Sequence, residues 1–393
     1  MDLFDKCYGF TQAKMAKAMG VYPYFTVLDD TEGTEVLIEG RRVLMIGSNN
    51  YLGLTTDPRV RQASIEAVQR FGTSCTGSRF LNGNLRLHEE LEAQLADYVG
   101  KQAALVFSTG FQVNLGTISC LVQKGDVVVA DKDDHASIVD GCMLALGEMR
   151  RFNHNDLDHL DRVLAGIDEK AGRLVVVDGV YSMGGDLAPL PEMVPICKKH
   201  GARLMVDDAH SLGVMGGGRG TAAHFGLTDQ VDLIMGTFSK SFASLGGFIA
   251  SDEDIIHYIQ HHARSLIFSA SMPASNVAAV MASLEIMRNE TDRIERLWQV
   301  TERMRAGLRA AGFNTGPSVT PVIPIIIGDF EKTITAWNLC FQRGLYTNAV
   351  IPPGVPPDQC LLRTSYMATH TDDQIDRALE ILCGVGRELE LIA

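Results

Sequence analysis

Six short apolar runs between residues 103 and 250 limit most strongly what this chain can fold into. Segments with helical patterns separate the runs, and the hydrophobicity within each run is continuous rather than alternating. Such runs are typical of strands that are buried on both faces. The runs cover 103–107, 127–130, 174–177, 204–206, 231–235 and 247–250. The sequence therefore predicts an α/β fold with a mainly parallel central sheet and helices on both faces.

The chain has 393 residues, more than one ordinary core requires, so a second domain is expected. After Pro273 a long helical stretch to about Ala311 leads to an apolar run at 321–327, a strand at 360–365 and a helix from Asp372. We expect an N-terminal segment over 1–55, a large α/β domain over 56–275 and a smaller α+β C-terminal domain over 276–393. Whether the N-terminal segment packs with the small domain stays open.

Local patterns give further elements before residue 100. A helix is expected over 5–19, and two short strands about a Glu39-Gly40 turn over 35–46. Two more helices are expected over 58–71 and 85–99.

The formal net charge of -13 argues against general nucleic-acid binding. Eight cysteines without a C-x-x-C pair fit a reducing compartment and offer no metal spacing. The N-terminus lacks the basic-then-apolar order of a secretory signal, and the uncharged stretches 102–123 and 265–284 are too polar for a membrane span. We expect a cytoplasmic protein; peripheral membrane contact stays open.

Polar residues follow four of the apolar runs. Ser108-Thr-Gly-Phe111 precedes a helical segment, whose first N–H groups can hold a phosphate. The next runs are followed by His135, by Asp178 and by Asp207-Asp-Ala-His210. Ligands of open α/β sheets collect at the carboxyl ends of the strands. These side chains are therefore expected to share one site.

Lys240 is the only charged residue between Met235 and Ala250. Loss of hydration in such surroundings lowers the pKa of a lysine, so that its neutral amine can form a Schiff base with a carbonyl. The neighbouring Thr237 and Ser239 can donate hydrogen bonds to a phosphate. A pyridoxal-phosphate (PLP) enzyme requires these groups. The ordinary alternative is a lysine whose stem lies on apolar surface while its ammonium group stays in water.

Two other classes of function compete with this interpretation. One is a protein that binds PLP without catalysis. The intact set of lysine, aspartate and histidine argues against it. The other is a metal-dependent hydrolase, which leaves Lys240 and its hydroxylated neighbours unexplained. Its metal ligands would be Asp133, Asp134, His135, Asp207, Asp208 and His210.

Three motifs resemble those of the α-oxoamine synthases, PLP enzymes of fold type I that condense an amino acid with an acyl-CoA and release carbon dioxide and CoA. The motifs are Asp-Asp-Ala-His-Ser-Leu-Gly at 207–213, the glycine-rich 216–221 and Gly-Thr-Phe-Ser-Lys-Ser at 236–241. The resemblance extends from Tyr22 to Thr364. Segments 20–25, 77–83 and 237–242 are most similar to the members that use L-serine and a long-chain acyl-CoA.

The resemblance implies roles for individual residues. Lys240 would carry the cofactor, Asp207 would pair with its pyridine nitrogen, and His135 would stack on its ring; these three are the predicted catalytic residues. His210 would contact the phenolic oxygen. Further cofactor contacts would come from Gly110, Phe111, Ser182, Thr237 and Ser239.

Three more residues complete the expected site. Asn50 and Arg363 would hold the substrate carboxylate, because a guanidinium fork binds both oxygens at once. Ser269 would reach the phosphate in the other subunit of a homodimer. Asp178 stands where some relatives carry glutamate, so its role stays open.

Overall fold

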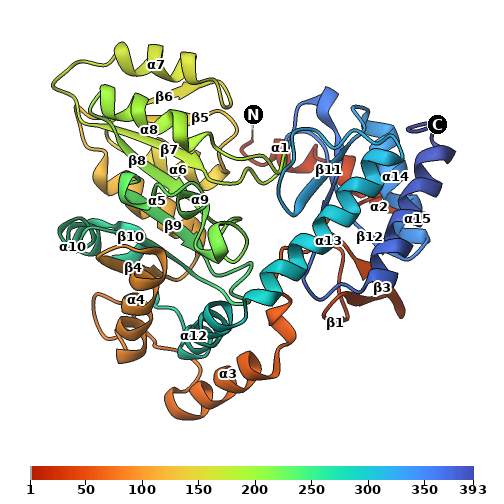
Figure 1. Cartoon of the computed structure of the whole chain (residues 1–393), viewed down its shortest axis with the longest axis horizontal. Helices are drawn as coiled ribbons and strands as arrows, with labels where there is room; N and C mark the ends of the chain where they lie inside the picture. The colour runs from red at the N-terminus through yellow and green to blue at the C-terminus, as the bar shows by residue number, and fades with distance from the viewer. Residues whose placement is uncertain (1) are drawn as a thin grey trace. The chain divides into compact units, whose positions relative to one another are not determined.

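A computed structural model describes residues 2–393, which form two compact units (Figure 1). The large unit contains residues 49–298 and 319–321. The small unit contains the described residues up to Ser48 together with 299–318 and 322–393. The small unit resumes at residue 299 rather than 276, because a helix at 274–289 packs on a helix at 58–71 of the large unit, and the first boundary lies at 48/49 rather than 55/56.

Seven strands form the central sheet of the large unit, in the order β4-β10-β9-β8-β7-β5-β6. They are β4 (Ala103–Phe107), β5 (Val127–Asp131), β6 (Glu148–Phe152), β7 (Arg173–Asp178), β8 (Arg203–Asp207), β9 (Leu233–Thr237) and β10 (Gly247–Ser251). Every pair is parallel except the two that β10 makes with β4 and β9. The predicted mainly parallel sheet is confirmed, and all six apolar runs are strands.

The seventh strand, β6, was not predicted. It lies at the edge of the sheet and carries Glu148, Arg150 and Arg151, so it lacks the continuous apolar pattern of the central strands. Figure 1 shows α7 (Leu157–Ala165) beside this edge and α4 (Arg86–Val99) beside β4 at the opposite edge.

Helices cover both faces of the sheet. On one face, alternate strand residues such as Leu105, Val128 and Met205 form one buried cluster with residues of four helices. These helices are α5 (Gly110–Leu121), α6 (Ala136–Leu144), α10 (Glu253–His262) and α11 (Arg264–Ile267). Helices α4, α7 and α8 (Leu190–Lys199) contact the sheet without joining this cluster, and so cover the opposite face. Each fully buried valine or leucine contributes about 1.5–3 kcal/mol relative to an exposed one.

Further helices of the large unit are α3 (Pro58–Phe71), α9 (Thr221–His224) and α12 (Ala274–Asn289). The single helical stretch predicted from Pro273 to Ala311 is wrong in one respect. It forms two helices, α12 and α13 (Thr291–Ala310), because Glu290 between them leaves the helical region with φ -117° and ψ 73°.

The small unit is the predicted α+β domain. One antiparallel sheet has the order β11 (Val322–Ile326), β14 (Leu361–Ser365), β13 (Asn348–Val350). A second sheet has the order β1 (Asp30–Glu32), β2 (Glu35–Ile38), β3 (Arg41–Met45), β12 (Leu345–Tyr346). The helices are α14 (Phe330–Gln342), α15 (Asp372–Glu388) and the later part of α13, preceded in the chain by α1 (Asp5–Tyr8) and α2 (Gln12–Ala18).

The N-terminal segment belongs to this small unit, a question that the sequence left open. The predicted hairpin is β2 and β3, and β3 pairs in parallel with β12. Leu44 and Ile46 are buried in one cluster with Trp337 and Leu362. The helix expected over 5–19 is interrupted at 9–11. In residues 2–393, none of the helices has the length and apolar character needed to cross a bilayer.

Candidate active site

A cavity of about 330 Å³ opens in the large unit where the carboxyl ends of the parallel strands meet. It is lined by Thr109, Gly110, Phe111, His135, Ser137, Asp178, Val180, Ser182, Asp207, Ala209, His210, Met235, Thr237, Ser239, Lys240, Leu245 and Gly246. Nine of the ten residues predicted to bind the cofactor therefore lie together. They come from the segments that follow β4, β5, β7, β8 and β9.

Asp207 lies at the end of β8, and its side chain is fixed by two donors. Asn114 Nδ2 donates to Oδ2 at 2.8 Å, and the Ala209 N–H donates to Oδ1 at 2.9 Å. Asp207 is 3% exposed and Asn114 is fully buried. Both donors stabilise the charged carboxylate, which can therefore pair with a protonated ring nitrogen. Sequence reasoning missed Asn114, although it is a polar residue one turn after Gly110 in the helix that follows β4.

His135 is the N-cap residue of α6, and its tautomer follows from its contacts. The Ser137 N–H donates to Nδ1 at 3.3 Å, and Ser137 Oγ lies 2.8 Å from the same nitrogen. Because Nδ1 accepts, the ring proton of a neutral His135 is on Nε2. Burial lowers the pKa of His135; the negative charge of Asp207 opposes this effect and the positive charge of Lys240 adds to it. The edge of the Phe111 ring lies against the imidazole, with 6.4 Å between ring centres.

The N-terminus of α5 provides backbone donors at one end of the cavity. Thr109 caps the helix, with its Oγ1 accepting from the Gln112 N–H at 3.2 Å. The first N–H groups of a helix lack intrahelical acceptors and attract phosphate. A Cβ on Gly110 would lie 2.7 Å from Thr237 Oγ1, so only glycine fits here. Thr237 Oγ1 donates to the Gly246 carbonyl at 3.1 Å and lies 3.0 Å from Ser239 Oγ.

Lys240 lies on the loop 238–246 between β9 and β10. Because β10 runs antiparallel to β9, both ends of this loop are anchored in the sheet. The Phe238 N–H donates to the Gly246 carbonyl and the Ser244 N–H to the Phe238 carbonyl, both at 2.9 Å. Phe238 and Phe242 are fully buried beneath the loop. The backbone around the half-buried Lys240 is thus fixed, and its side chain can reach into the cavity.

A group of buried carboxylates lies behind His135. The His135 N–H donates to Asp178 Oδ2 at 3.2 Å, and the Asp178 N–H donates to Asp134 Oδ1 at 2.9 Å. Burial, and then the charge of neighbouring aspartates, raises the pKa of both Asp134 and Asp178 well above the ordinary range. Asp178, whose role the sequence left open, thus receives the backbone N–H that sets the position of His135.

His154 supplies the positive charge of this region. Its Nδ1 lies 3.1 Å from Asp131 Oδ1 and its Nε2 lies 2.8 Å from Asp186 Oδ2. Burial disfavours the charged ring, but the hydrogen bonds to the two carboxylates outweigh this and raise the pKa of His154 to about 10. The Asp131 N–H also donates to Asp134 Oδ2 at 2.9 Å, which connects His154 to the group behind His135. We call Asp131, Asp134, His154, Asp178 and Asp186 the buried acid cluster.

His210 is held from the segment that carries Asn50. Tyr51 Oη lies 2.8 Å from His210 Nδ1, and both side chains are buried. Asn50 Nδ2 donates to Thr55 Oγ1 at 2.8 Å. The sequence gives no role to Tyr51, because only the fold brings it to His210.

Three predicted residues do not line the cavity. Asn50 is buried in the segment before Tyr51, and Ser269 Oγ accepts from Gln112 Nε2 at 2.9 Å. Arg363 is buried in β14 of the small unit. Their roles stay proposals.

The cavity fits PLP and not the alternative metal. The fixed carboxylate of Asp207 suits the ring nitrogen of PLP, and Lys240 suits its aldehyde. The start of α5, where Gly110 closely approaches Thr237, suits the phosphate. The six residues named for a metal site do not form one: in residues 2–393, no three His, Cys, Asp or Glu side chains gather in a way that could hold a metal ion.

Comparisons with known proteins agree with this chemistry. Residues 41–382 match the family "Aminotransferase class I and II". A serine palmitoyltransferase from Sphingobacterium spiritivorum is 49% identical over 390 residues, 99% of this chain and 98% of that protein. An 8-amino-7-oxononanoate synthase from Symbiobacterium thermophilum is 41% identical over 378 residues, 96% of each chain.

Two solved structures are similar over the full length of both chains. One is a Sphingomonas wittichii serine palmitoyltransferase, with a TM-score of 0.97 and 40% identity. The other is a serine palmitoyltransferase from S. paucimobilis with a bound PLP–myriocin aldimine, with a TM-score of 0.97 and 39% identity. The chain therefore belongs to the aminotransferase class I and II family, as a PLP-dependent enzyme of fold type I.

Proposed function

We propose that the protein condenses L-serine with palmitoyl-CoA, giving 3-ketodihydrosphingosine, CoA and carbon dioxide. This is the reaction of a serine palmitoyltransferase, the first step of sphingolipid biosynthesis. The observation that carries the proposal is the convergence of Lys240, Asp207 and His135 on one cavity that ends at the start of α5. The relatives named serine palmitoyltransferase support the choice of substrates.

When bound, PLP supplies an aldehyde that captures amines and a protonated ring that withdraws electrons from the substrate Cα. Asp207, fixed by Asn114 and Ala209, would hold the proton on the ring nitrogen. Lys240 Nζ, as a neutral amine, would accept the Cα proton of serine. His135 would cover one ring face, and its Nε2–H is a donor because Nδ1 already accepts from Ser137.

The remaining predicted residues bind and orient. The N–H groups of Gly110 and Phe111 donate to the phosphate. Further polar contacts with the cofactor come from Ser182, Thr237 and Ser239, and His210 donates to the phenolic oxygen. Asn50 and Arg363 hold the serine carboxylate. In a homodimer, Ser269 of one subunit contacts the phosphate bound in the other. We place the protein in the cytoplasm.

Replacing Lys240 tests the centre of the site. The Lys240→Ala protein should retain no cofactor adduct after borohydride reduction and no condensation activity. A variant that still carries a reducible adduct at another residue would show that Lys240 is not the residue that binds the cofactor.

Purified wild-type protein should absorb visible light as bound PLP does, and its activity should not respond to a chelator. Colourless protein whose activity is lost with a chelator would favour the metal-dependent hydrolase.

A substrate screen tests the reaction. L-serine, glycine and L-alanine are each combined with acyl-CoAs of short, medium and long chain, and release of CoA is followed. We expect the largest kcat/KM for serine with a long chain. Preference for alanine or glycine would instead indicate an 8-amino-7-oxononanoate synthase or a 2-amino-3-ketobutyrate CoA ligase, whose chemistry the same residues can perform.

A further inference from the structure

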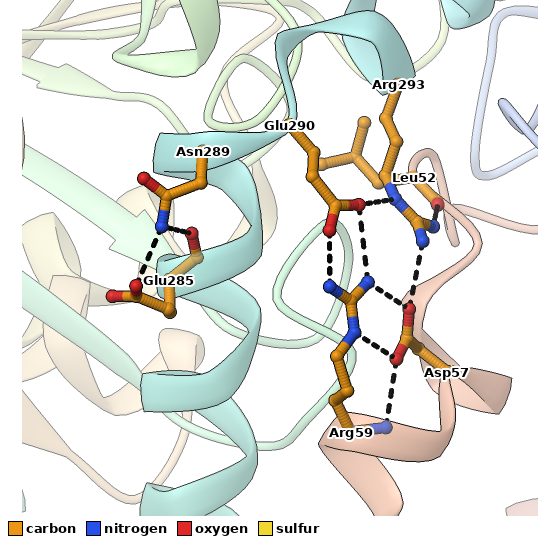
Figure 2. A network of polar contacts seen from close by, with 7 residues as sticks. All are labelled: Leu52, Asp57, Arg59, Glu285, Asn289, Glu290 and Arg293. Atoms are coloured by element: carbon orange, nitrogen blue, oxygen red, sulfur yellow. Dashed lines mark hydrogen bonds and ion pairs between the residues drawn. The ribbon is translucent and has the colours of Figure 1, made fainter.

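Four charged side chains form a closed network at the junction of α12 and α13 (Figure 2). Arg293 Nη2 donates to Asp57 Oδ2 at 2.9 Å and Arg293 Nε to Glu290 Oε2 at 2.7 Å. Arg59 binds the same two carboxylates, with Nη2 2.9 Å from Asp57 Oδ2 and 3.2 Å from Glu290 Oε2. We call Asp57, Arg59, Glu290 and Arg293 the clamp.

Three of the four clamp side chains are less exposed than those of an ordinary surface ion pair, whereas Arg59 is 53% exposed. The Asp57 side chain is 5% exposed, Arg293 24% and Glu290 29%. Asp57 also caps α3, because its Oδ1 accepts from the Arg59 N–H at 3.0 Å. Glu290 is the single non-helical residue between two helices, and Figure 2 shows its carboxylate directed at both arginines. Hydrogen bonds from Arg59 and Arg293 lower the pKa of Glu290 to about 2, so the network stays charged at neutral pH.

The clamp holds the segment 49–57, which carries Asn50, proposed to bind the substrate, and Tyr51, the partner of His210. Arg293 Nη1 donates to the Leu52 carbonyl at 3.4 Å. The preceding residue, Tyr51, is bonded to His210, and Asn50 lies one residue further back. Asp57 ends the segment. The segment is therefore held through the Leu52 carbonyl and through the Asp57 side chain.

The same helix also holds the segment that carries His210. Trp298 Nε1 of α13 donates to the Val214 carbonyl at 3.1 Å, four residues after His210. Residues 291–298 thus bind the backbone on both sides of the Tyr51–His210 hydrogen bond. Neither Arg293 nor Trp298 lines the cavity.

We infer that Arg293 and Glu290 are positioning residues, which set Asn50 and the Tyr51–His210 pair for substrate and cofactor from outside the cavity. The physical reason is geometric: Tyr51 and Leu52 are adjacent, so a shift of the Leu52 carbonyl displaces the Tyr51 hydroxyl. A displacement of about 1 Å at a reacting group can cost up to about 100-fold in rate. The part of the inference that concerns serine rests on the proposed function.

The test compares Arg293→Met with Arg293→Lys and with the milder Glu290→Gln. The matched control is Arg303→Met, an arginine of the same helix whose Nη2 pairs with Asp376 at 2.6 Å within the small unit. Three quantities are measured on PLP-loaded protein: KM for L-serine against KM for the acyl-CoA, the visible absorption of the bound cofactor, and backbone hydrogen exchange over 49–57.

We expect Arg293→Met to raise KM for serine by about 10-fold, with little change in KM for the acyl-CoA. Its absorption band should shift, since His210 loses its fixed position, and exchange over 49–57 should accelerate. Arg293→Lys and Glu290→Gln should show smaller changes in the same direction, because each keeps some of the bonds. Arg303→Met should match the wild type in all three quantities.

The inference is overturned if Arg293→Met loses thermal stability while its absorption band, exchange over 49–57 and serine KM equal those of Arg303→Met. Should the wild type not turn over serine at all, the proposed function fails. The absorption and exchange measurements still decide the role of the clamp in that case, because neither requires turnover.

Discussion

The large unit contains two groups of acidic residues, the clamp and the buried acid cluster, and the pKa of Asp134 and Asp178 in the cluster shifts in the opposite direction to the pKa of the clamp carboxylates. In the clamp, hydrogen bonds from arginines lower the pKa of both Asp57 and Glu290. In the buried acid cluster, burial and like charges raise the pKa of Asp134 and Asp178. Burial also acts on Asp131, but its hydrogen bonds from His154 and from backbone N–H groups outweigh burial and lower its pKa. The nearby cations and donors and the loss of water, rather than the residue type, decide in which direction the pKa of an aspartate shifts.

The difference has a functional meaning. The clamp is a charged, partly exposed network of ion pairs, which dissolved salt can weaken. The buried acid cluster supports His135 from inside the protein, where few ions penetrate, and the raised pKa values of Asp134 and Asp178 favour their neutral forms, which limits the negative charge next to Asp207. The experiments below test this contrast, from the largest expected effect to the smallest.

The largest effect is expected when the charge of Asp207 is removed. Asp207→Asn should reduce kcat/KM by about 100-fold or more, because the proton on the cofactor nitrogen loses its partner. The matched control is Asp208→Asn: Asp208 is buried beside it but does not line the cavity, and burial raises the pKa of that carboxyl to about 6. Steady-state kinetics should show a much smaller loss for the control. Equal losses would mean that general disruption, not the charge, is responsible.

Replacing His154 should mainly change stability. His154→Leu leaves Asp131 and Asp186 without their cation, and we expect the free energy of unfolding to fall by about 3 kcal/mol, the low end for a broken buried pair since the ring is 24% exposed. The folded-state pKa is raised above the usual 6.5, so this contribution is complete below pH about 6.5 and lost as the pH rises towards 10.

Urea unfolding at several pH values between these limits measures that effect. The gap between wild type and His154→Leu should narrow as the pH rises. His200 provides the control, because its carboxylate partner Asp161, at 2.7 Å, is 36% exposed whereas the two partners of His154 are buried or nearly so; His200→Leu should therefore change stability less. A gap that is constant with pH would show that His154 is not charged in the folded protein.

The smallest effect on stability is expected in the clamp. Glu290→Gln should lower the free energy of unfolding by about 0.5–1 kcal/mol at low ionic strength, as for partly exposed ion pairs. The pKa of Glu290 is lowered to about 2, so its contribution is present above pH about 4.5 and lost as the pH falls towards 2.

Salt separates the two groups of acidic residues. In about 1 M salt the Debye length is about 3 Å, and the difference between Glu290→Gln and the wild type should shrink. The difference caused by His154→Leu should persist, because its partners are buried. Thermal unfolding at low and high salt measures both stability differences. The same salt response in both variants would show that the clamp and the buried acid cluster do not differ in their exposure to ions.

The central sheet could be predicted because its strands carry their own signal. Runs such as 127–130 and 174–177 are buried on both faces, so hydrophobicity alone identifies them. The polar residues of the cavity were also predictable, since Asp207 and His210 directly follow a strand. Parallel strands bring such positions to the same edge of the sheet.

Features that depend on a distant partner could not be predicted in this way. β6 is charged and is a strand only because it pairs with β5. Asn114 and Tyr51 become informative only when the fold places them on Asp207 and His210. The break at Glu290 lies within a helical pattern, and its partners Arg59 and Arg293 stabilise a conformation that local preference does not indicate.

The antiparallel course of β10 has a consequence for turnover. With both ends of the loop 238–246 fastened in the middle of the sheet, the amine of Lys240 is restricted to a small volume whether or not another amine occupies the cavity. A group confined in this way acts at a high effective concentration, on the order of millimolar or more. After each cycle the enzyme can therefore reset by a short side-chain motion, without waiting for an encounter by diffusion.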